Sequence, residues 1–283
     1  MGAEQSSPSE YFTGEKICEN WSQWMSGIPG STSLADISIP GTHNSLCFHG
    51  GDLVQCQSMS LYNQYIAGIR FVDIRCRHYG DGFTIHHGEV YQHATFGHAL
   101  EPTLDFLREN PSETVIMSIK EEHTSVENTR SFEETFNSYL SKYDSSLFYT
   151  SKSVPKLEEV RGKIVFLSRF SKTIGIDFGE QDVEDDYYVA TILPDSINPK
   201  LDGIIKHIEK ARKLSNRDKF YITFCSGVSS GAYPYAVANR INIHVRRHAE
   251  KYKGEGCLGI VILDFPGSWV SHAIFMTNPG ASP

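Results

Sequence analysis

The chain has 283 residues, of which 40% are hydrophobic and 21% charged, and its formal net charge at pH 7 is -8. This composition is ordinary for a globular protein and supplies ample apolar material for one large domain or two small ones. The acidic balance argues against a nucleic-acid binder, which needs a basic face. No apolar run approaches the roughly 20 residues that cross a bilayer as a helix.

The N-terminal segment, residues 1–14, is polar, and we expect it to be flexible and to precede the main domain, residues 15–283. Its first residues, MGAEQS, fit the short pattern for N-myristoylation at Gly2. A signal-peptide pattern, basic and then apolar, is absent from the sequence. These features leave three locations open: the cytoplasm, the periphery of a membrane, or outside the cell after removal of a signal peptide.

Six cysteines are scattered along the chain without CxxC pairs. Their spacing argues against a zinc site and against a small scaffold held by many disulfides. We expect free thiols in a reducing compartment. One or two disulfides in a secreted form are the alternative.

Apolar residues at helical or alternating spacing predict secondary structure through the whole chain. Helices are expected over 15–25, 58–67, 97–109, 131–143, 200–214 and 235–252. Strands are expected over 35–39, 70–77, 83–87, 114–121, 163–170, 220–224 and 258–265. Glycines at 80 and 82 indicate a hairpin-type turn, and 171–186 is expected to be an irregular loop.

Strands that alternate with helices in this way indicate an α/β protein with a parallel sheet. Polar residues gather where at least five of the predicted strands end. This distribution favours a barrel, whose active sites lie at the carboxyl ends of the strands, over an open sheet with one ligand crevice. Neither GxGxxG nor the P-loop pattern occurs, which lowers the odds of a nucleotide cofactor.

The segment DISIPGTHNS places His43 just past the end of the first predicted strand. Other chemistry-bearing residues repeat this layout at later strand ends: Asp73, Arg75, His87, Lys120, Arg169 and Asp264. Two histidines on opposite sides of a reacting centre can act as general base and general acid. An arginine between them suits a phosphate, and a carboxylate behind one histidine supports its charged form. The pattern suits phosphoryl transfer to a neighbouring hydroxyl without a metal, and it also suits structural ion pairs inside a barrel; the residues alone do not decide between the two.

The strand predicted over 83–87 ends in two adjacent histidines, His86 and His87. Consecutive residues of a strand point to opposite faces, so at most one of the two can reach a shared site. The same alternation puts Asp73 and Arg75 on one face of the strand over 70–77.

Seven segments between Asn20 and Phe265 carry a family resemblance. They are NWSQWM (Asn20–Met25), ISIPGTHNS (Ile37–Ser45), FVDIRCR (Phe71–Arg77), IHHGEVY (Ile85–Tyr91), NPSETVIMSIKEE (Asn110–Glu122), RGKIVFLSRFS (Arg161–Ser171) and LGIVILDF (Leu258–Phe265). Their residues and their order resemble the bacterial-type phosphatidylinositol-specific phospholipases C. The resemblance implies a distorted, incompletely closed TIM barrel that forms a single domain. It also implies an enzyme that cleaves phosphatidylinositol to diacylglycerol and a 1,2-cyclic inositol phosphate.

The resemblance further implies roles for individual residues. His43 would deprotonate the inositol 2-hydroxyl with Asp264 behind it, and His87 would protonate the diacylglycerol oxygen. Arg75 would stabilise charge on the non-bridging phosphate oxygens. The residues expected around the inositol hydroxyls are Asp73, Lys120, Arg169, Asp185 and Tyr187. We expect a monomer that acts on phosphatidylinositol at a membrane surface and binds no nucleic acid; a glycosylphosphatidylinositol (GPI) anchor is open as an alternative substrate.

Asn44 is the main departure from the family pattern. Bacterial members carry aspartate there, where it orients and charges the acid histidine. Asparagine brings no charge, so support for protonated His87 is expected to weaken. Calcium-dependent relatives do have asparagine here, together with a carboxylate where this chain has Arg75. Because a guanidinium repels a cation and replaces its charge, we expect no metal, no cofactor and activity without calcium.

Two other functions compete with this one. A glycerophosphodiesterase or a sphingomyelinase-D-like lipase needs a carboxylate cluster around a divalent metal, which Arg75 disfavours. A non-catalytic inositol-lipid binder would be an enzyme weakened at Asn44. The presence of both histidines, Arg75 and Asp264 favours an active enzyme over such a binder.

Overall fold

The computed structural model describes residues 5, 10–12, 19–214 and 218–282. Its main sheet has the strand order β6-β7-β5-β2-β1-β11-β10-β9, and all pairings along this path are parallel. The strands are β1 (Ile39–Thr42), β2 (Phe71–Tyr79), β3 (Gly82–His87), β4 (Val90–Thr95), β5 (Val115–Glu121), β6 (Phe148–Tyr149), β7 (Ile164–Ser168), β8 (Ile176–Asp177), β9 (Asp182–Glu184), β10 (Tyr221–Phe224) and β11 (Ile260–Leu263). Within the described residues no pairing joins β9 to β6, so the barrel is open. This is the incompletely closed α/β barrel that the sequence predicts.

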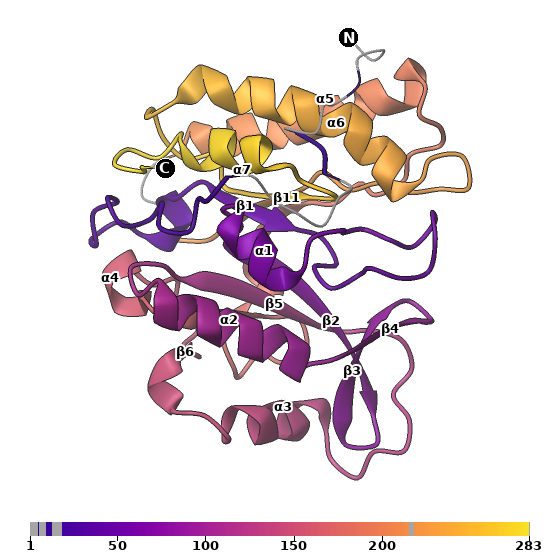
Figure 1. Ribbon diagram of the computed structural model, residues 1–283, viewed down its shortest axis with the longest axis vertical. Helices are drawn as coiled ribbons and strands as arrows, with labels where there is room; N and C mark the ends of the chain where they lie inside the picture. The colour runs from indigo at the N-terminus through magenta and orange to yellow at the C-terminus, as the bar shows by residue number, and fades with distance from the viewer. Residues whose placement is uncertain (1–4, 6–9, 13–18, 215–217, 283) are drawn as a thin grey trace.

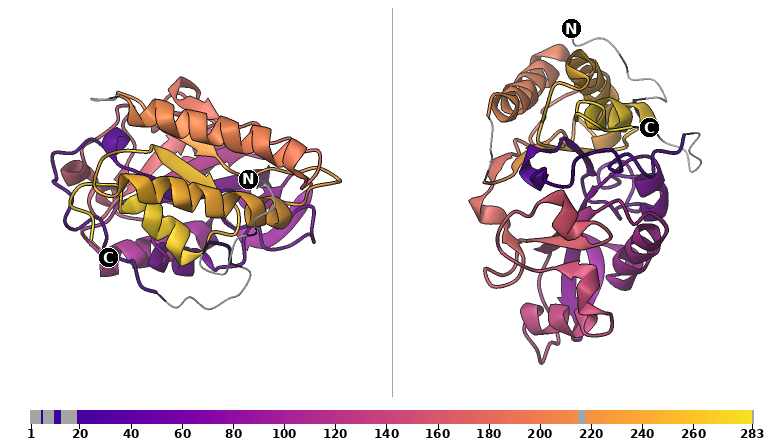
Figure 2. Two further views of the ribbon diagram at one scale, coloured as in Figure 1. Left: turned by 90° about the horizontal axis from the view of Figure 1, so that it is seen from above. Right: turned by 90° about the vertical axis from the view of Figure 1, so that its left-hand side faces the viewer.

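Helices lie around the sheet and follow most of its parallel strands. They are α1 (Leu61–Ile66), α2 (Gly97–Glu109), α3 (Phe132–Leu140), α4 (Leu157–Val160), α5 (Pro194–Arg212), α6 (Pro234–Ala249) and α7 (Ser268–Phe275). α5, α6 and α7 lie together in the upper part of the molecule, while α2 and α3 lie in the lower part (Figure 1). Seen from above, α5 and α6 run side by side (Figure 2). No helix of the described part of the chain is long and apolar enough to cross a membrane.

A hairpin extends the sheet beyond β2. β3 pairs antiparallel with β2, β4 pairs antiparallel with β3, and the turn between β2 and β3 is made by Gly80 and Asp81 at positive φ. The hairpin turn is therefore confirmed, whereas β4 was not predicted. The register pairs Cys76 with Ile85, and β3 ends two residues further on at His87. Figure 1 shows the hairpin at the lower right of the molecule.

The first strand begins later than predicted. Leu34–Asp36 form a short 3-10 helix in which the Ser33 side chain accepts a hydrogen bond from the amide of Ala35, and β1 starts only at Ile39. Pro40 and Gly41, residue types that often interrupt a strand, lie inside β1. A Cβ on Gly41 would lie 2.9 Å from the Phe71 side chain, so β1 and β2 approach closely only because residue 41 is glycine.

Other boundaries also differ from the predictions. The helix predicted over 15–25 is wrong in its described part, because residues 19–21 are irregular and 22–25 form turns, and Met25 donates its amide to Glu113 rather than to a helical carbonyl. The loop predicted over 171–186 contains β8 and β9, and α5 begins at Pro194, six residues before the predicted start. α4 and α7 were not predicted. Gly2 and residues 15–18 lie outside the described residues, and the domain boundary at residue 15 stays a prediction.

The parallel strands near the centre of the sheet are buried on both faces. Every residue of β1, β7, β10 and β11 is buried, which explains why their sequences are almost continuously apolar. Helices cover one side of these strands, and the barrel interior covers the other. The polar residues of the site therefore follow these strands, and Asp73 and Arg75 reach the same level because Val72 of β2 pairs with Thr42, the last residue of β1.

A buried ion pair anchors the chain before β2. Arg70 and Glu113 lie 2.8 Å apart with both side chains fully buried, and Arg70 also donates to the carbonyls of Tyr65 and Ser22. Replacing Glu113 with glutamine leaves the guanidinium buried without its counter-charge. We expect the free energy of unfolding to fall by about 3 kcal/mol, measured by chemical denaturation. The exposed pair of Arg108 and Asp105 provides the control, because Asp105→Asn should have little effect.

Candidate active site

Two neighbouring strand ends bring His43 and Asp264 together. His43 follows β1 directly, Asp264 follows β11, and these two strands pair in parallel up to Thr42 and Leu263. Nδ1 of His43 lies 2.9 Å from Oδ1 of Asp264. Gln57 holds the two strand ends in place, because its amide donates to the carbonyl of His43 at 2.8 Å and to that of Leu263 at 3.1 Å.

The surroundings of His43 favour a charged imidazole. Burial lowers its pKa, but the adjacent carboxylate of Asp264 raises it more, and the pKa reaches about 9. Nε2 of His43 lies 3.1 Å from the side-chain amide of Asn44, which donates to it when the ring is neutral. Asn44 has φ 43°, a left-handed conformation that asparagine tolerates better than most residues. Asn44 thus turns back onto the histidine that precedes it.

Asp73 and Arg75 lie on the same face of β2, as predicted. The carboxylate of Asp73 is buried and accepts a hydrogen bond from Nε of Arg75 at 3.0 Å and from the amide of Asn44 at 3.2 Å. Arg169, just after β7, lies 3.6 Å from its other oxygen. Burial raises the pKa of Asp73, but the two guanidinium groups lower it well below its ordinary value. Asp73 is therefore a charged anchor for two arginines.

Glu122 was not predicted as a site residue, although it follows Lys120 within a segment of the family resemblance. Its carboxylate lies 2.7 Å from Nζ of Lys120 and 3.9 Å from Arg75, and it accepts the amide of Gly88 at 3.0 Å. Although burial raises the pKa of Glu122, Arg75 and Lys120 lower it below the ordinary value. Glu122 links the end of β5 to Arg75 and to the turn after His87.

His87 reaches the same mouth of the barrel from the end of β3. Its ring centroid lies 6.2 Å from that of His43, at an interplanar angle of 84°. His86 points to the other side of the strand and lies against the rings of Tyr91 and His123, as the strand alternation predicts. Only one of the two adjacent histidines therefore lies beside His43.

The contacts of His87 differ from expectation. The predicted contact with Asn44 is not among the hydrogen bonds of the described residues; Nδ1 of His87 instead donates to the carbonyl of Val54 at 2.9 Å and lies 3.4 Å from Sγ of Cys47. The reason is the loop between β1 and α1, which inserts Val54 and two cysteines on this side of the ring. Burial lowers the pKa of His87, but contacts with Cys56 and Val54 raise it above the ordinary value. The partner of Nδ1 of His87 is thus a backbone carbonyl and not the side chain of residue 44.

Asp185 and Tyr187 lie at the rim, after β9. Both are exposed, Tyr187 to 63%. Desolvation raises the pKa of Asp185, and the charges of His43 and Lys200 partly offset the rise. Asp185 thus lies within electrostatic range of the histidine, whereas Tyr187 projects into solvent.

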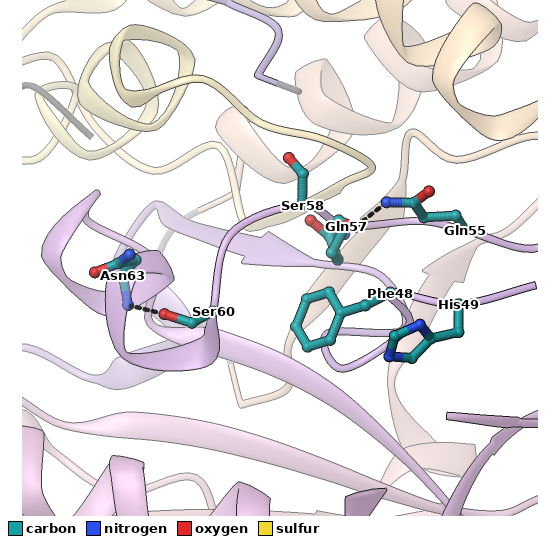
Figure 3. A pocket seen from close by; sticks show the side chains of 7 residues that line it. All are labelled: Phe48, His49, Gln55, Gln57, Ser58, Ser60 and Asn63. Atoms are coloured by element: carbon teal, nitrogen blue, oxygen red, sulfur yellow. Dashed lines mark hydrogen bonds between the residues drawn. The ribbon is translucent and has the colours of Figure 1, made fainter. Parts of the chain in front are cut away.

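A surface pocket of about 590 Å³ opens on the loop that carries Val54. It is lined by Phe48, His49, Gln55, Gln57, Ser58, Ser60 and Asn63. Figure 3 shows the ring of Phe48 below Gln57, with Ser60 and Asn63 to the left. Because Gln57 also holds the carbonyl of His43, this pocket adjoins the site.

The arrangement suits chemistry on a phosphate ester. One imidazole has a carboxylate behind it, the second lies opposite, and a forked cation that is permanently charged lies on the strand between them. Among the described residues, two groups of side chains offer a metal ligand atoms within 4.8 Å of one another: Cys47, Cys56 and His87, and His43, Cys56 and Asp264. Taken together, the fold and the site define an open α/β barrel that gathers two histidines, two carboxylates and an arginine at one mouth.

Comparisons with known proteins agree with this class. Residues 31–170 match the family described as "Phosphatidylinositol-specific phospholipase C, X domain". The 1-phosphatidylinositol phosphodiesterase of Listeria monocytogenes is 35% identical over 90% of this chain and 84% of its own length. The protein of the same name from Staphylococcus aureus is 30% identical, over 89% of this chain and 91% of its own. The solved phosphatidylinositol-specific phospholipase C of Listeria monocytogenes superimposes with a TM-score of 0.79 at 31% identity, covering 92% of this chain and 99% of that structure.

The chain belongs to the phosphatidylinositol-specific phospholipase C family. The resemblance noted in the sequence is therefore confirmed, and so is the barrel fold that it implied.

Proposed function

We propose that this protein is a phosphatidylinositol-specific phospholipase C that cleaves phosphatidylinositol at a membrane surface into diacylglycerol and 1,2-cyclic inositol phosphate. The observation that carries the proposal is the pairing of His43 with Asp264 at 2.9 Å, opposite His87 and next to Arg75. The named relatives act on 1-phosphatidylinositol, which supports the same substrate here.

In the first half of the reaction His43 is the base. Nε2 of the neutral ring takes the proton of the inositol 2-hydroxyl, and the freed oxygen attacks phosphorus. The carboxylate of Asp264 holds Nδ1–H and stabilises the imidazolium that forms. Asn44 donates to Nε2 until the substrate hydroxyl replaces it, so it keeps the neutral ring in position.

In the second half His87 is the acid. Nδ1–H stays on the Val54 carbonyl, and Nε2 delivers its proton to the glycerol oxygen as the phosphorus–oxygen bond to diacylglycerol breaks. Arg75 compensates the charge on the non-bridging oxygens. The proton taken by His43 and the proton given by His87 balance, and later exchange with water restores both rings.

The remaining site residues bind or position the sugar. Lys120, Arg169 and Asp185 offer charged groups to the inositol hydroxyls, with Tyr187 at the rim. Asp73 acts through Arg75 and Arg169, because its carboxylate is buried against them. We propose a monomer for this reaction, and a GPI anchor as a second substrate to be compared with the free lipid.

Release of water-soluble inositol phosphate from phosphatidylinositol vesicles in the presence of EDTA tests the proposal. We expect release with EDTA at the same rate as without it, and the first product should be the cyclic phosphate. A metal-dependent glycerophosphodiesterase would stop in EDTA, and a non-catalytic binder would release nothing in either buffer. Either result would reject the proposed mechanism.

The pH dependence of kcat/KM tests the role of Asp264. The base must be neutral, so the raised pKa of His43, about 9, sets an acidic limb near that pH in the free enzyme. In Asp264→Asn the carboxylate charge that raises the pKa of His43 is lost, while burial still lowers that pKa. We expect the limb to move below pH 6.5, the ordinary value of an imidazole, while the maximal rate falls. An unchanged limb would assign the titration to another group.

A further inference from the structure

Two cysteines lie side by side next to His87, on the loop between β1 and α1. The amides of Cys56 and Gln57 both donate to the carbonyl of Cys47 at 3.1 Å, which brings the two ends of the segment 47–56 together. Sγ of Cys47 lies 3.4 Å from Nδ1 of His87, and Sγ of Cys56 lies 4.0 Å from the same atom. The two sulfurs and this nitrogen all lie within 4.8 Å of one another.

These three atoms point at one backbone oxygen. The Val54 carbonyl lies 3.0 Å from Sγ of Cys47, 3.2 Å from Sγ of Cys56 and 2.9 Å from Nδ1 of His87. A carbonyl oxygen has two lone pairs, so three donors exceed its capacity. Hydrogen bonding to Val54 therefore does not by itself explain why all three groups converge here.

The spacing matches that of a tetrahedral zinc ion. With Zn–S bonds of about 2.3 Å and Zn–N bonds of about 2.0–2.1 Å, sulfur and nitrogen ligands lie about 3.6 Å apart. The two S···N distances, 3.4 and 4.0 Å, lie on either side of this value. The Val54 oxygen contacts all three atoms and offers a fourth ligand.

We infer that Cys47, Cys56 and His87 form a binding site for a soft divalent cation of the Zn²⁺ class, and that the bound ion blocks catalysis. Two thiolates and an imidazole select zinc or cadmium over the hard cations calcium and magnesium. Binding releases the two thiol protons, and the resulting pair of negative charges neutralises the ion in a buried position. The absence of CxxC pairs gave no sign of this site, because its ligands come from both ends of a loop and from a separate strand.

The blocking effect rests on the proposed function. An ion on Nδ1 moves the ring proton to Nε2 and prevents the imidazole from gaining a second proton. His87 then cannot become the imidazolium that protonates the leaving oxygen. The ion therefore acts on the acid step, and His43 keeps its pairing with Asp264.

Cadmium titration of the full-length, reduced, chelator-stripped protein tests the site without using activity. We expect one equivalent of Cd²⁺ to produce the ultraviolet sulfur-to-cadmium absorption. Loss of an outer-shell partner already lowers metal affinity by about 10–100-fold, so Cys47→Ser, which removes a ligand, should lower it at least as much. Cys257→Ser is the matched control, because this buried thiol lies before β11, away from the strand ends of the site, and contacts the Ala35 carbonyl. No sulfur absorption, or the same titration in Cys47→Ser and wild type, would overturn the inference.

Cys47 also separates the two candidate groups. The second group, His43, Cys56 and Asp264, shares Cys56 but not Cys47. An ion held there would survive Cys47→Ser, and that result would count against the site proposed here.

Inhibition is measured separately, as the Zn²⁺ concentration that halves the release of inositol phosphate by each variant relative to its own rate in EDTA. We expect this concentration to rise at least about tenfold in Cys47→Ser and to stay unchanged in Cys257→Ser. If cadmium binds stoichiometrically but zinc does not inhibit, the metal site stands and the proposed inhibition is rejected. If the wild type shows no cleavage in EDTA, the proposed function fails, while the cadmium titration still decides the site.

Discussion

Replacing His87 with glutamine should lower kcat for phosphatidylinositol cleavage by about 10³-fold, because a positioned general acid contributes roughly 10²–10⁴-fold. Alkoxides are poor leaving groups, and without a proton from His87 the diacylglycerol oxygen would have to leave as one. The change is measured as initial rates of inositol phosphate release from vesicles. His86→Gln is the matched control on the adjacent residue, which lies on the opposite face of β3 against Tyr91 and His123, and it should retain activity.

The leaving group separates an acid from a merely structural residue. An inositol phosphate ester of a nitrophenol expels a stable phenolate and needs no proton. His87→Gln should therefore lose much less activity on this ester than on the natural lipid. The corresponding change at the base, His43→Gln, should lose similar activity on both. Equal losses for His87→Gln on the two substrates would remove it from the role of acid.

Replacing Arg75 with lysine should lower kcat by about 10³-fold with little change in KM. Arginines that stabilise a transferring phosphoryl group contribute roughly 10³–10⁵-fold. Lysine keeps a positive charge between Asp73 and Glu122, so folding should be preserved, but it lacks the two-pronged donor that fits two phosphate oxygens. Thermal unfolding of the variant provides the check on folding.

Arg77→Lys is the control on the same face of β2. Arg77 donates to the carbonyl of Thr124 and lies against the ring of Tyr79. We expect the loss of kcat in Arg77→Lys to be at least about tenfold smaller than the loss in Arg75→Lys. Comparable losses at both positions would point to a general effect of charge on this face rather than to contact with the phosphate.

Much of the fold follows from local sequence, and the exceptions have physical causes. α2 was predicted at its observed bounds because its apolar residues repeat at helical spacing between clear turn signals. β1 was misplaced because Pro40 and Gly41 normally break a strand. Here the Pro40 carbonyl accepts a hydrogen bond from Arg70 where the pairing of β1 with β2 begins, so the missing amide hydrogen of proline costs no interior ladder bond. Gly41 is required by the contact with Phe71, which only the tertiary structure reveals.

The site was predictable where its residues stand at strand ends. Parallel strands bring their carboxyl ends to one edge, so His43, Arg75 and Asp264 could be grouped before their distances were known. The partners of His87 could not be predicted, because they depend on how the loop around Val54 folds. Asn44 was expected to serve His87 by family resemblance, yet its left-handed backbone turns its amide onto His43.

The charges around Arg75 bear on what leaves the enzyme after turnover. Three cations, Arg75, Arg169 and Lys120, face two carboxylates, Asp73 and Glu122, so one positive charge is left over for a ligand. A phosphodiester lipid and its cyclic product each carry one negative charge, and either restores electroneutrality equally well. Release of the cyclic inositol phosphate therefore follows from loss of the lipid tail and not from electrostatic repulsion by the site. An opened inositol monophosphate, with up to two negative charges at neutral pH, would exceed the single spare positive charge by one.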